Sequence, residues 1–317
     1  MKKRKKILFM VLCVIVTALS LLNIYYTIGN NNYDKKIKEL INSGKMNFHI
    51  RSTIDHKTIE NNGNTIHYFV SGNEEGEAIV FLHPAFGDHK CFDKQVDYFS
   101  PNYRIITIDM LGHGLTGVGK SKDKITATVT HISEILRVEN QDKAHIAGVS
   151  LGSLIAQDFA IKYPEKVLSL TGLGGYNINK EQKEINKAQR SEMSKWLFKM
   201  IFSMNAFRRY VATTTVIEST EQVRYYESAR LFTRKSFTVM SGLDSLIHER
   251  EVIQRKYPIL VLVGKKDVEL AIKSAKQWHE DELDSEFYVI EQAGHCANMD
   301  NAEKFNKILM NFIATRK

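Results

Sequence analysis

The stretch AHIAGVSLGSLIAQDFAIKY, from Ala144 to Tyr163, has the pattern of a buried strand that turns sharply into a helix. Its apolar start breaks at GVSLG, residues 148–152, and apolar residues then return with helical spacing. The glycines two places before and after Ser150 permit so tight a turn, because a side chain there would strike the neighbouring backbone. We therefore expect Ser150 at the apex, with its hydroxyl exposed above a sheet. Because Gly and Ser also occur in ordinary loops, the surrounding pattern has to support this interpretation.

Apolar runs of strand length recur along the chain and alternate with segments of helical periodicity. The expected strands are Ala78–His83, Arg104–Asp109, Ala144–Val149, Val167–Leu173, Ile259–Val263 and Phe287–Ile290. The expected helices are Ile125–Glu139, Leu151–Tyr163, Ala271–Leu283 and Ala302–Ala314. Runs that are apolar on both faces belong to parallel strands with helices on either side of the sheet. With a hairpin signal, Asn-Asn-Gly near residue 62, the alternation predicts a doubly wound α/β fold with a mostly parallel sheet.

Between about residues 176 and 255 the alternation is interrupted. Apolar residues there follow a helical stripe, which comprises Met193, Trp196, Leu197, Met200, Ile201 and Met204. The stripe fits plain core packing, and it also fits a helical cap that roofs Ser150 and forms a hydrophobic substrate pocket. Basic residues in the same segment fit a solvated face or a contact with anionic lipid.

The N-terminus carries five basic residues, 2–6, followed by 22 residues without a charge from Ile7 to Ile28. As a helix this run is about 33 Å long, enough to cross the hydrocarbon core of a bilayer. We expect residues 1–29 to be an uncleaved membrane anchor, with a cleaved signal peptide as the alternative. Residues 30–52 then form a spacer, and residues 53–317 form the globular domain with its cap. The basic end is expected inside the cell and the domain outside, or secreted if the segment is cleaved.

Charge and cysteine usage exclude several other classes of protein. The formal net charge is +8, but five of these charges lie in the N-terminal cluster, so no footprint for nucleic acid is left. The three cysteines, Cys13, Cys91 and Cys296, have neither zinc-site spacing nor the pattern of a disulfide framework. Neither a metal nor a cofactor is expected.

A catalytic serine needs a base that removes its proton and a carboxylate that orients the base. Asp267 follows the strand PILVLVG, and His295 follows the strand FYVIEQ. Both lie at carboxyl ends of strands, where open α/β sheets place their sites. The sequence therefore predicts a catalytic triad of Ser150, Asp267 and His295.

The negative oxygen that forms during acyl transfer needs two N–H donors. The N–H of Leu151, at the start of the helix, is one candidate. The turn after the strand AIVFLH supplies the other, with Ala85 as first choice and Phe86 as second. Pro84 has no N–H and is excluded.

From about residue 64 to residue 313 the chain resembles the α/β-hydrolase superfamily, in its capped, single-domain, esterase-like branch. The matching motifs are HPAFGD, IDMLGHGLT, GVSLG, VGKKD and AGHCANMD. The resemblance implies that Ser150 is the nucleophile, His295 the general base and then acid, and Asp267 the residue that orients it. It also implies that the stretch after Gly172 is a helical cap.

Two positions depart from the family pattern. Pro84 replaces the usual glycine after the histidine of the oxyanion turn, and Ser153 replaces a frequent glycine after the elbow. Neither change removes a catalytic group, but both leave the choice of oxyanion donor open. His83, His113 and Asp109 also match family positions, and we expect them to support loops.

The sequence as a whole predicts a membrane-anchored serine hydrolase that cleaves a carboxylic ester through an acyl-Ser150 intermediate. Aminopeptidase-like cleavage, C–C bond hydrolysis and acyl transfer to an alcohol use the same triad and stay open as alternatives. The intact triad argues against a non-enzymatic binding module. The expected partners are a small-molecule ester or other acyl substrate and, through the N-terminal helix, the membrane. The identity of the substrate and the oligomeric state are not encoded in these patterns.

Overall fold

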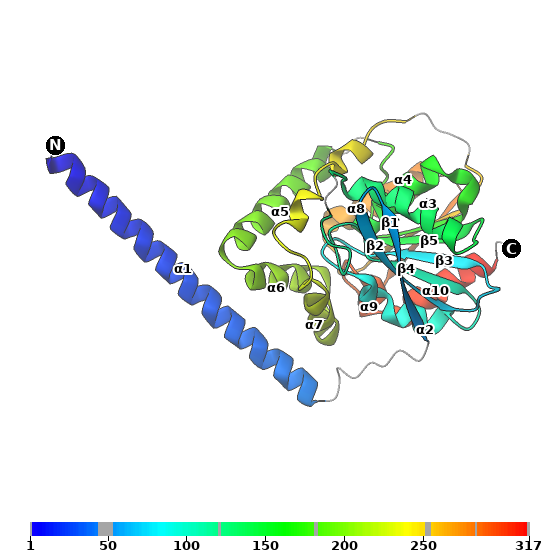
Figure 1. Cartoon of the computed structure of the whole chain (residues 1–317), viewed down its shortest axis with the longest axis horizontal. Coiled ribbons are helices and arrows are strands. Elements are labelled where there is room, and N and C mark those ends of the chain that lie inside the picture. Colours follow the sequence, from blue (N-terminus) through cyan, green and yellow to red (C-terminus); the bar gives the residue numbers. More distant parts are fainter. Residues whose placement is uncertain are drawn as a thin grey trace.

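The computed structural model describes residues 2–43, 53–119, 122–180, 183–250, 255–282 and 284–315, and Figure 1 shows its elements. The strands are β1 (Ile54–Asn61), β2 (Asn64–Gly72), β3 (Ala78–Leu82), β4 (Arg104–Ile108), β5 (Ala144–Val149), β6 (Val167–Leu173), β7 (Ile259–Gly264) and β8 (Ser285–Ile290). The helices are α1 (Lys2–Asn42), α2 (Asp93–Phe99), α3 (Thr128–Val138), α4 (Leu151–Lys162), α5 (Lys183–Phe202), α6 (Met204–Thr215), α7 (Ser219–Ser228), α8 (Glu269–Asp281), α9 (Ala297–Asp300) and α10 (Ala302–Ala314).

All eight strands belong to one sheet, in the order β1-β2-β4-β3-β5-β6-β7-β8. The pairs from β4 through β8 are parallel, whereas β2 runs antiparallel to both β1 and β4. The hairpin of β1 and β2 turns at Asn62 and Gly63, which both have positive φ, as the Asn-Asn-Gly signal predicts. The central strands β3 and β5 are buried along their whole length. The doubly wound, mostly parallel α/β sheet is therefore confirmed.

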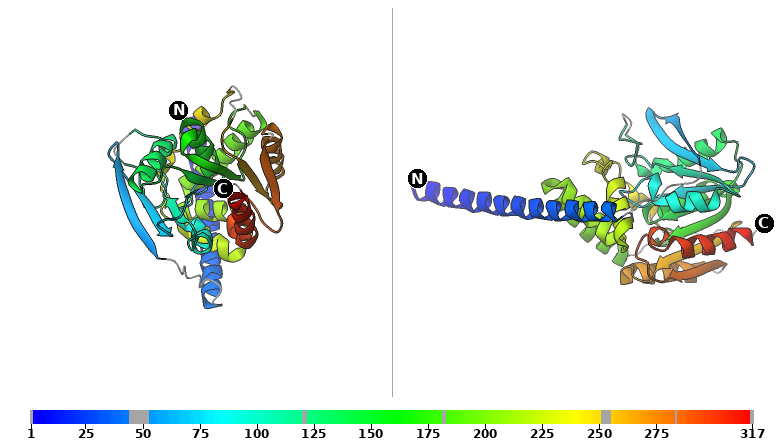
Figure 2. Two further views of the ribbon diagram at one scale, coloured as in Figure 1. Left: turned by 90° about the vertical axis from the view of Figure 1, so that its right-hand side faces the viewer. Right: turned by 90° about the horizontal axis from the view of Figure 1, so that it is seen from below.

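Helices cover both faces of the sheet (Figure 2). One face carries α3, α4 and α8, whose buried side chains include Phe159 and Trp278. The other face carries α2 and α10, which contribute Phe99 and Phe305. Burial of each such aromatic side chain stabilises the fold by about 1.5–3 kcal/mol.

The predicted strands and helices are confirmed, with ends that differ by up to three residues. The helix expected from Ile125 begins as a 3-10 turn, Ile125–Ala127, before α3. Leu283, where another helix was expected to end, lies outside the described residues. The short helix α2 was not predicted.

Helix α1 is continuous and projects from the globular part of the molecule (Figures 1 and 2). Most of its large apolar side chains between Ile7 and Ile28 are exposed. Length and composition allow the part from Lys3 to Leu40 to cross a membrane, although a signal sequence has the same properties. The exposed apolar surface of α1 therefore calls for an apolar environment.

The C-terminal part of α1 packs on the globular part. The Tyr33 ring lies 4.8 Å from the Tyr226 ring on α7, measured between centroids. The Tyr33 hydroxyl donates to the Gln222 carbonyl at 3.4 Å, and the Lys36 ammonium donates to Gln222 Oε1 at 3.2 Å. The first part of the predicted spacer is thus helical as far as Asn42, and residues 44–52 lie outside the described residues.

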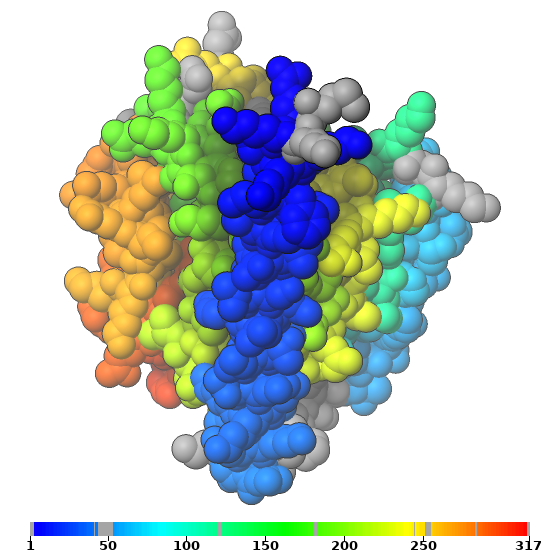
Figure 3. Space-filling view, turned by 90° about the vertical axis from the view of Figure 1, so that its left-hand side faces the viewer, coloured from blue at the N-terminus to red at the C-terminus, as the bar shows by residue number. Residues whose placement is uncertain are grey.

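The chain between β6 and β7, residues 174–258, we call the insertion. It contains α5, α6 and α7, and its described residues form no strand. Figure 3 shows the insertion, in green to yellow, on the face that is turned toward α1. Its helices match the segment expected as a cap, but whether it is a separate unit stays a prediction, as do the other domain limits.

The side chains of the apolar stripe on α5 lie in three different environments. Met200 is buried, whereas Met193 and Trp196 line cavities beside Ser150. Leu197 and Ile201 are 49% and 59% exposed. The expectation of plain core packing is therefore wrong for these two side chains, because no other part of the described chain covers them.

Candidate active site

Ser150 lies between β5 and α4 in a strained backbone conformation, with φ +52° and ψ −115°. A Cβ on Gly148 would lie 2.2 Å from the Gly152 carbonyl oxygen, and one on Gly152 would lie 2.0 Å from the Leu82 carbonyl oxygen. Both glycines are therefore required by close backbone contact, as the sequence indicates. Leu151 begins α4, so its N–H has no acceptor within the helix and lies next to the serine.

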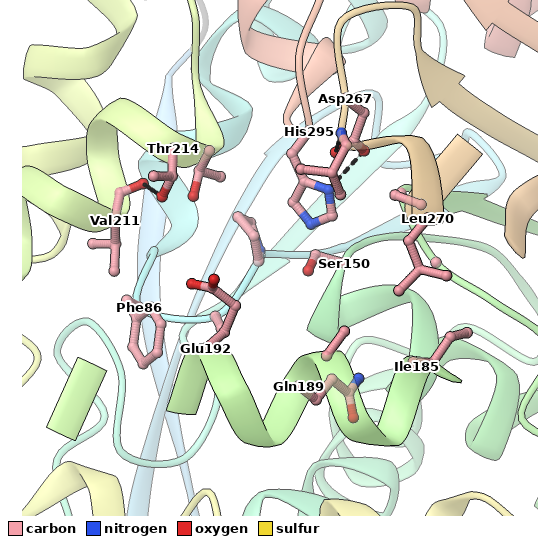
Figure 4. Close-up of a pocket in the computed structure, with 18 of the residues that line it drawn as sticks. Phe86, Ser150, Ile185, Gln189, Glu192, Val211, Thr214, Asp267, Leu270 and His295 are labelled. Atoms are coloured by element: carbon pink, nitrogen blue, oxygen red, sulfur yellow. Dashed lines mark hydrogen bonds and ion pairs between the residues drawn. The ribbon is translucent and has the colours of Figure 1, made fainter. Parts of the chain in front are cut away.

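His295 and Asp267 lie in loops after β8 and β7, and His295 lies between Asp267 and Ser150 (Figure 4). His295 Nδ1 is 2.8 Å from Asp267 Oδ2, so Nδ1–H donates to the carboxylate and Nε2 is left for the serine. The Val268 N–H donates to Asp267 Oδ1 at 2.7 Å, which holds the second carboxylate oxygen. All three predicted triad residues line one cavity.

The electrostatics of His295 favour its protonated form. Burial acts to lower the pKa of His295, but the negative charge of Asp267 and their hydrogen bond outweigh burial. The pKa of His295 is consequently raised above its ordinary value. An imidazole with this environment is a better proton acceptor than free histidine.

The turn after β3 forms another wall of this cavity. The Gly87 N–H donates to the Pro84 carbonyl at 3.1 Å, and Phe86 has φ +69°, as in the third position of a type II turn. The Tyr225 hydroxyl, from α7, donates to the Ala85 carbonyl and so fixes the peptide between Ala85 and Phe86. Ala85 and Phe86 both line the cavity, and both stay candidates for the second oxyanion donor.

The other family-like polar residues hold loops in place. His83 Nε2 accepts from the Met110 N–H at 3.0 Å, which joins the turn after β3 to the loop after β4. Asp109 accepts from the His89 N–H at 2.8 Å. The His113 ring lies 5.0 Å from that of His83, and burial lowers the pKa of His113 to about 3. These contacts agree with the structural roles expected for His83, His113 and Asp109.

Two cavities meet at Ser150. The first chamber, of about 630 Å³, is lined by His295 and Asp267. The second chamber, of about 840 Å³, is lined by Leu151 and not by His295. Ser150 and Ala85 line both chambers, so a bound molecule that reaches Ser150 can extend into each of them.

Two residues of the site are not marked by any sequence motif. Tyr225 holds the oxyanion turn, and Glu192 lines the first chamber from α5. Both belong to the insertion, and their proximity to Ser150 depends on how the insertion folds over the sheet. Trp196, which also lines the first chamber, belongs to the apolar stripe that the sequence assigns either to the core or to a cap.

Within the described residues, no group of three or more His, Cys, Asp or Glu side chains is arranged to hold a metal ion. Cys91 and Cys296 are buried free thiols, and burial raises the pKa of both well above its ordinary value. They are therefore poor nucleophiles near neutral pH.

Residues 77–241, more than half of the chain, match the family described as alpha/beta hydrolase fold. The chain belongs to this family. The match confirms the resemblance stated from the motifs and, with the sheet order, the fold class. The relatives of this alpha/beta hydrolase are also enzymes, which confirms the expectation of an enzyme.

The alpha/beta hydrolase is 24% identical over 272 residues to an (E)-2-((N-methylformamido)methylene)succinate hydrolase of Acinetobacter baylyi, across 82% of this chain and 98% of that enzyme. It is 24% identical to a monoacylglycerol lipase of Bos taurus, across 75% of each chain. A solved structure described as a membrane phospholipase A has the same fold, with a TM-score of 0.71 and 15% identity, and the likeness covers 95% of this chain and 98% of that one.

Proposed function

We propose that this alpha/beta hydrolase is a serine hydrolase that cleaves a carboxylic ester through an acyl-Ser150 intermediate. One observation carries the proposal. Ser150 is held at φ +52° on a strand-to-helix turn, in the same cavity as a histidine that is hydrogen-bonded to a buried carboxylate. The positive φ of Ser150 strains its backbone, and a strained serine beside a hydrogen-bonded histidine–carboxylate pair is typical of an activated nucleophile.

In the proposed reaction His295 Nε2 takes the proton of the Ser150 hydroxyl as its oxygen attacks the ester carbonyl. The Leu151 N–H and a second N–H from the turn after β3 stabilise the oxyanion. His295 then gives its proton to the departing alcohol oxygen. Water then attacks the acyl-enzyme, with His295 again as base and then as acid. This releases the carboxylic acid and restores the Ser150 hydroxyl.

The comparisons support hydrolysis but not one substrate. The relatives include a hydrolase of a substituted succinate and a lipase for monoacylglycerols, so these two enzymes act on chemically different substrates. Cleavage of peptides or C–C bonds and acyl transfer use the same groups.

A fluorophosphonate probe tests the proposal directly, because it reacts with activated serines. We expect labelling of the wild type at Ser150, and Ser150→Ala should lose both labelling and ester turnover, by about 10⁶ in kcat. A panel of p-nitrophenyl esters of increasing chain length, with aminoacyl arylamides beside it, then identifies the bond. Labelling of a different serine in the Ser150→Ala variant would refute the assignment.

We further infer that α1 anchors the enzyme in the cell membrane, with the globular part outside the cytoplasm. The exposed apolar surface between Ile7 and Ile28, preceded by a basic cluster, supports this orientation. The fold likeness to the membrane phospholipase A covers 95% of the chain, a share that includes part of α1.

Exposed apolar side chains on α5 support the same location. Met193, Leu197, Phe198, Ile201 and Phe202 are between 40% and 59% exposed. Figures 1 and 2 show α5 on the side of the globular part that faces α1. A bilayer crossed by α1 would lie on this side, where it can cover apolar surface that water otherwise contacts.

A further inference from the structure

We propose that the two chambers bind different halves of the ester, the alcohol in the first and the acyl group in the second. We further propose that Glu192 makes the first chamber selective for uncharged alcohol groups over anionic ones. The substrate class is thereby esters of an apolar acid with a neutral, hydroxyl-bearing alcohol. This inference rests on the proposed serine hydrolase function and adds to it the position and charge of the leaving group.

The position of His295 determines which chamber holds which half of the ester. The same imidazole that activates Ser150 must pass its proton to the oxygen of the departing alcohol, so that oxygen has to lie within hydrogen-bond reach of His295. His295 lines the first chamber and does not line the second. The alcohol therefore occupies the first chamber, and the acyl group extends past Leu151 into the second.

The second chamber suits a hydrocarbon acyl chain. Its apolar lining comes from both the globular domain and the insertion, and includes Leu154, Met193, Phe237, Met240, Leu243 and Ile247. Charged side chains also line this chamber at Arg190 and Glu249, but both are exposed and therefore mark its open end. Methionines adapt to flexible chains, which fits this assignment.

The first chamber carries a carboxylate close to the reacting serine. Glu192 rises from α5 into the cavity, on the side of Ser150 where Phe86 lies (Figure 4). Its Oε2 accepts from the Tyr210 hydroxyl at 2.9 Å, and its Oε1 accepts from the Lys195 ammonium at 2.5 Å. Lys195 lines neither chamber, so the surface that Glu192 presents to a bound alcohol is that of an acceptor.

The chemistry of this wall favours hydroxyl groups and disfavours anions. A carboxylate accepts hydrogen bonds from hydroxyl donors, and the Tyr210 and Thr214 side chains beside it offer further polar atoms. A phosphate or carboxylate on the leaving group would face a like charge in a partly desolvated cavity, where repulsion is stronger than in water. Lys195 pairs with Glu192 at 2.5 Å and offsets part of this repulsion, so the expected selectivity is that of a partly exposed, paired carboxylate.

The test compares two esters with the same acyl group, 1-decanoylglycerol and 1-decanoylglycerol 3-phosphate. We expect the wild type to favour the neutral ester in kcat/KM by at least about tenfold, which corresponds to about 1.4 kcal/mol. Glu192→Gln keeps the shape and removes the charge, and should reduce this preference by at least about fivefold. The matched control is Glu184→Gln, the same change on α5 at a residue that lines neither chamber, and it should leave the preference unchanged.

A second measurement locates the effect within the reaction. Both esters give the same decanoyl-enzyme, so the deacylation rate from single-turnover experiments should be equal for wild type and Glu192→Gln. A changed deacylation rate would place Glu192 beside the acyl group and overturn the assignment of the chambers. In the wild type the preference should also fall as salt rises, because screening weakens charge repulsion.

Failure of this inference and failure of the proposed function look different. If both esters are hydrolysed equally well, or if Glu192→Gln keeps the full preference, the selectivity is refuted while the serine hydrolase stands. If neither ester is turned over and no probe labels Ser150, both the selectivity and the serine hydrolase function are refuted.

Discussion

Asp267 favours the protonated form of the proposed base through its negative charge and, to a smaller extent, through one hydrogen bond. His295 is partly buried, with a side chain that is 24% exposed, and desolvation acts to lower its pKa, so the raised pKa depends on the carboxylate 2.8 Å away. The general base has to be neutral to accept the serine proton. The activity should therefore increase with pH as His295 loses its proton, at a pH above the ordinary histidine pKa of about 6.5.

Asp267→Asn should change both the size and the pH dependence of the activity. We expect kcat to fall by about 10⁴, because the amide favours the wrong imidazole tautomer. The lower pKa in kcat/KM should also move down, since burial then acts on His295 without an opposing charge. Profiles of kcat/KM against pH measure both effects. The control Asp284→Asn, at an exposed position before β8, should keep the wild-type profile, and an unshifted pKa in Asp267→Asn would point to another carboxylate.

Residues of the site differ in how visible they are in the sequence. Ser150, Asp267 and His295 each follow a predicted strand, and parallel strands bring their carboxyl ends to one edge, so local patterns suffice to group them. Glu192 does not follow a predicted strand. It lies on an exposed helix among many charged residues, and only the packing of α5 over the sheet brings it near Ser150.

At the scale of elements, α7 and the turn after β3 form one unit. The Tyr225 hydroxyl holds the Ala85 carbonyl, and the Ser228 hydroxyl donates to Asp88 Oδ1 at 2.7 Å. The Phe86 ring packs edge-on against Phe207 of α6, with centroids 5.0 Å apart. The insertion therefore positions the proposed oxyanion turn as well as covering the site.

Tyr225→Phe should impair catalysis without unfolding the protein. Loss of the hydrogen bond frees the peptide between Ala85 and Phe86, and we expect kcat to fall about fivefold to tenfold, in line with about 1 kcal/mol for a net hydrogen bond. The matched control is Tyr226→Phe, the neighbouring tyrosine that packs on α1. Steady-state kinetics with thermal unfolding would check the prediction. A Tyr225→Phe enzyme with wild-type kcat would show that its hydroxyl does not position the turn.

Elements with a strong hydrophobic pattern in the sequence were predictable, and elements with a weak pattern were not. β3 and β5 are buried on both faces, so β3 is a continuous apolar run and β5 is apolar apart from His145. Helix α2 has seven residues, too few for a period to be visible. The stripe on α5 has a clear helical period, but period alone does not distinguish buried from exposed apolar residues, so the sequence allowed core packing for Leu197 and Ile201, which are exposed.

At the scale of the whole molecule, α1 contains both the proposed membrane span and the residues that contact α7, a helix beside the active site. Tyr33 and Lys36 contact Gln222 and Tyr226 of α7, and the same helix α7 carries Tyr225. α1 is helical throughout, so no flexible link separates its apolar part from this contact. With α1 in the membrane as proposed, the globular part would therefore turn one defined face toward the bilayer.

Membrane attachment predicts a specific fractionation result. The full-length protein should stay with membranes after washing with high salt or carbonate, and protease added to intact cells should remove the globular part. Val14→Lys combined with Leu19→Lys should release it, because each cation at the centre of a span costs about 2.5–3.5 kcal/mol. A protein found in the medium and shortened by about 25 residues would identify the segment as a signal peptide.

The pairing of β6 with β7 has a consequence for the order in which the protein is assembled. These neighbours are separated by the whole insertion, so the sheet can be completed only after the ribosome has made the chain as far as the end of β8, Ile290. Long-range parallel pairs also form slowly, since their loops must close first. A nascent chain that ends between residues 150 and 258 contains Ser150 but neither Asp267 nor His295. With the proposed triad, the serine is therefore inert until the chain beyond residue 258 has been made, and it becomes a nucleophile only when the final two strands dock.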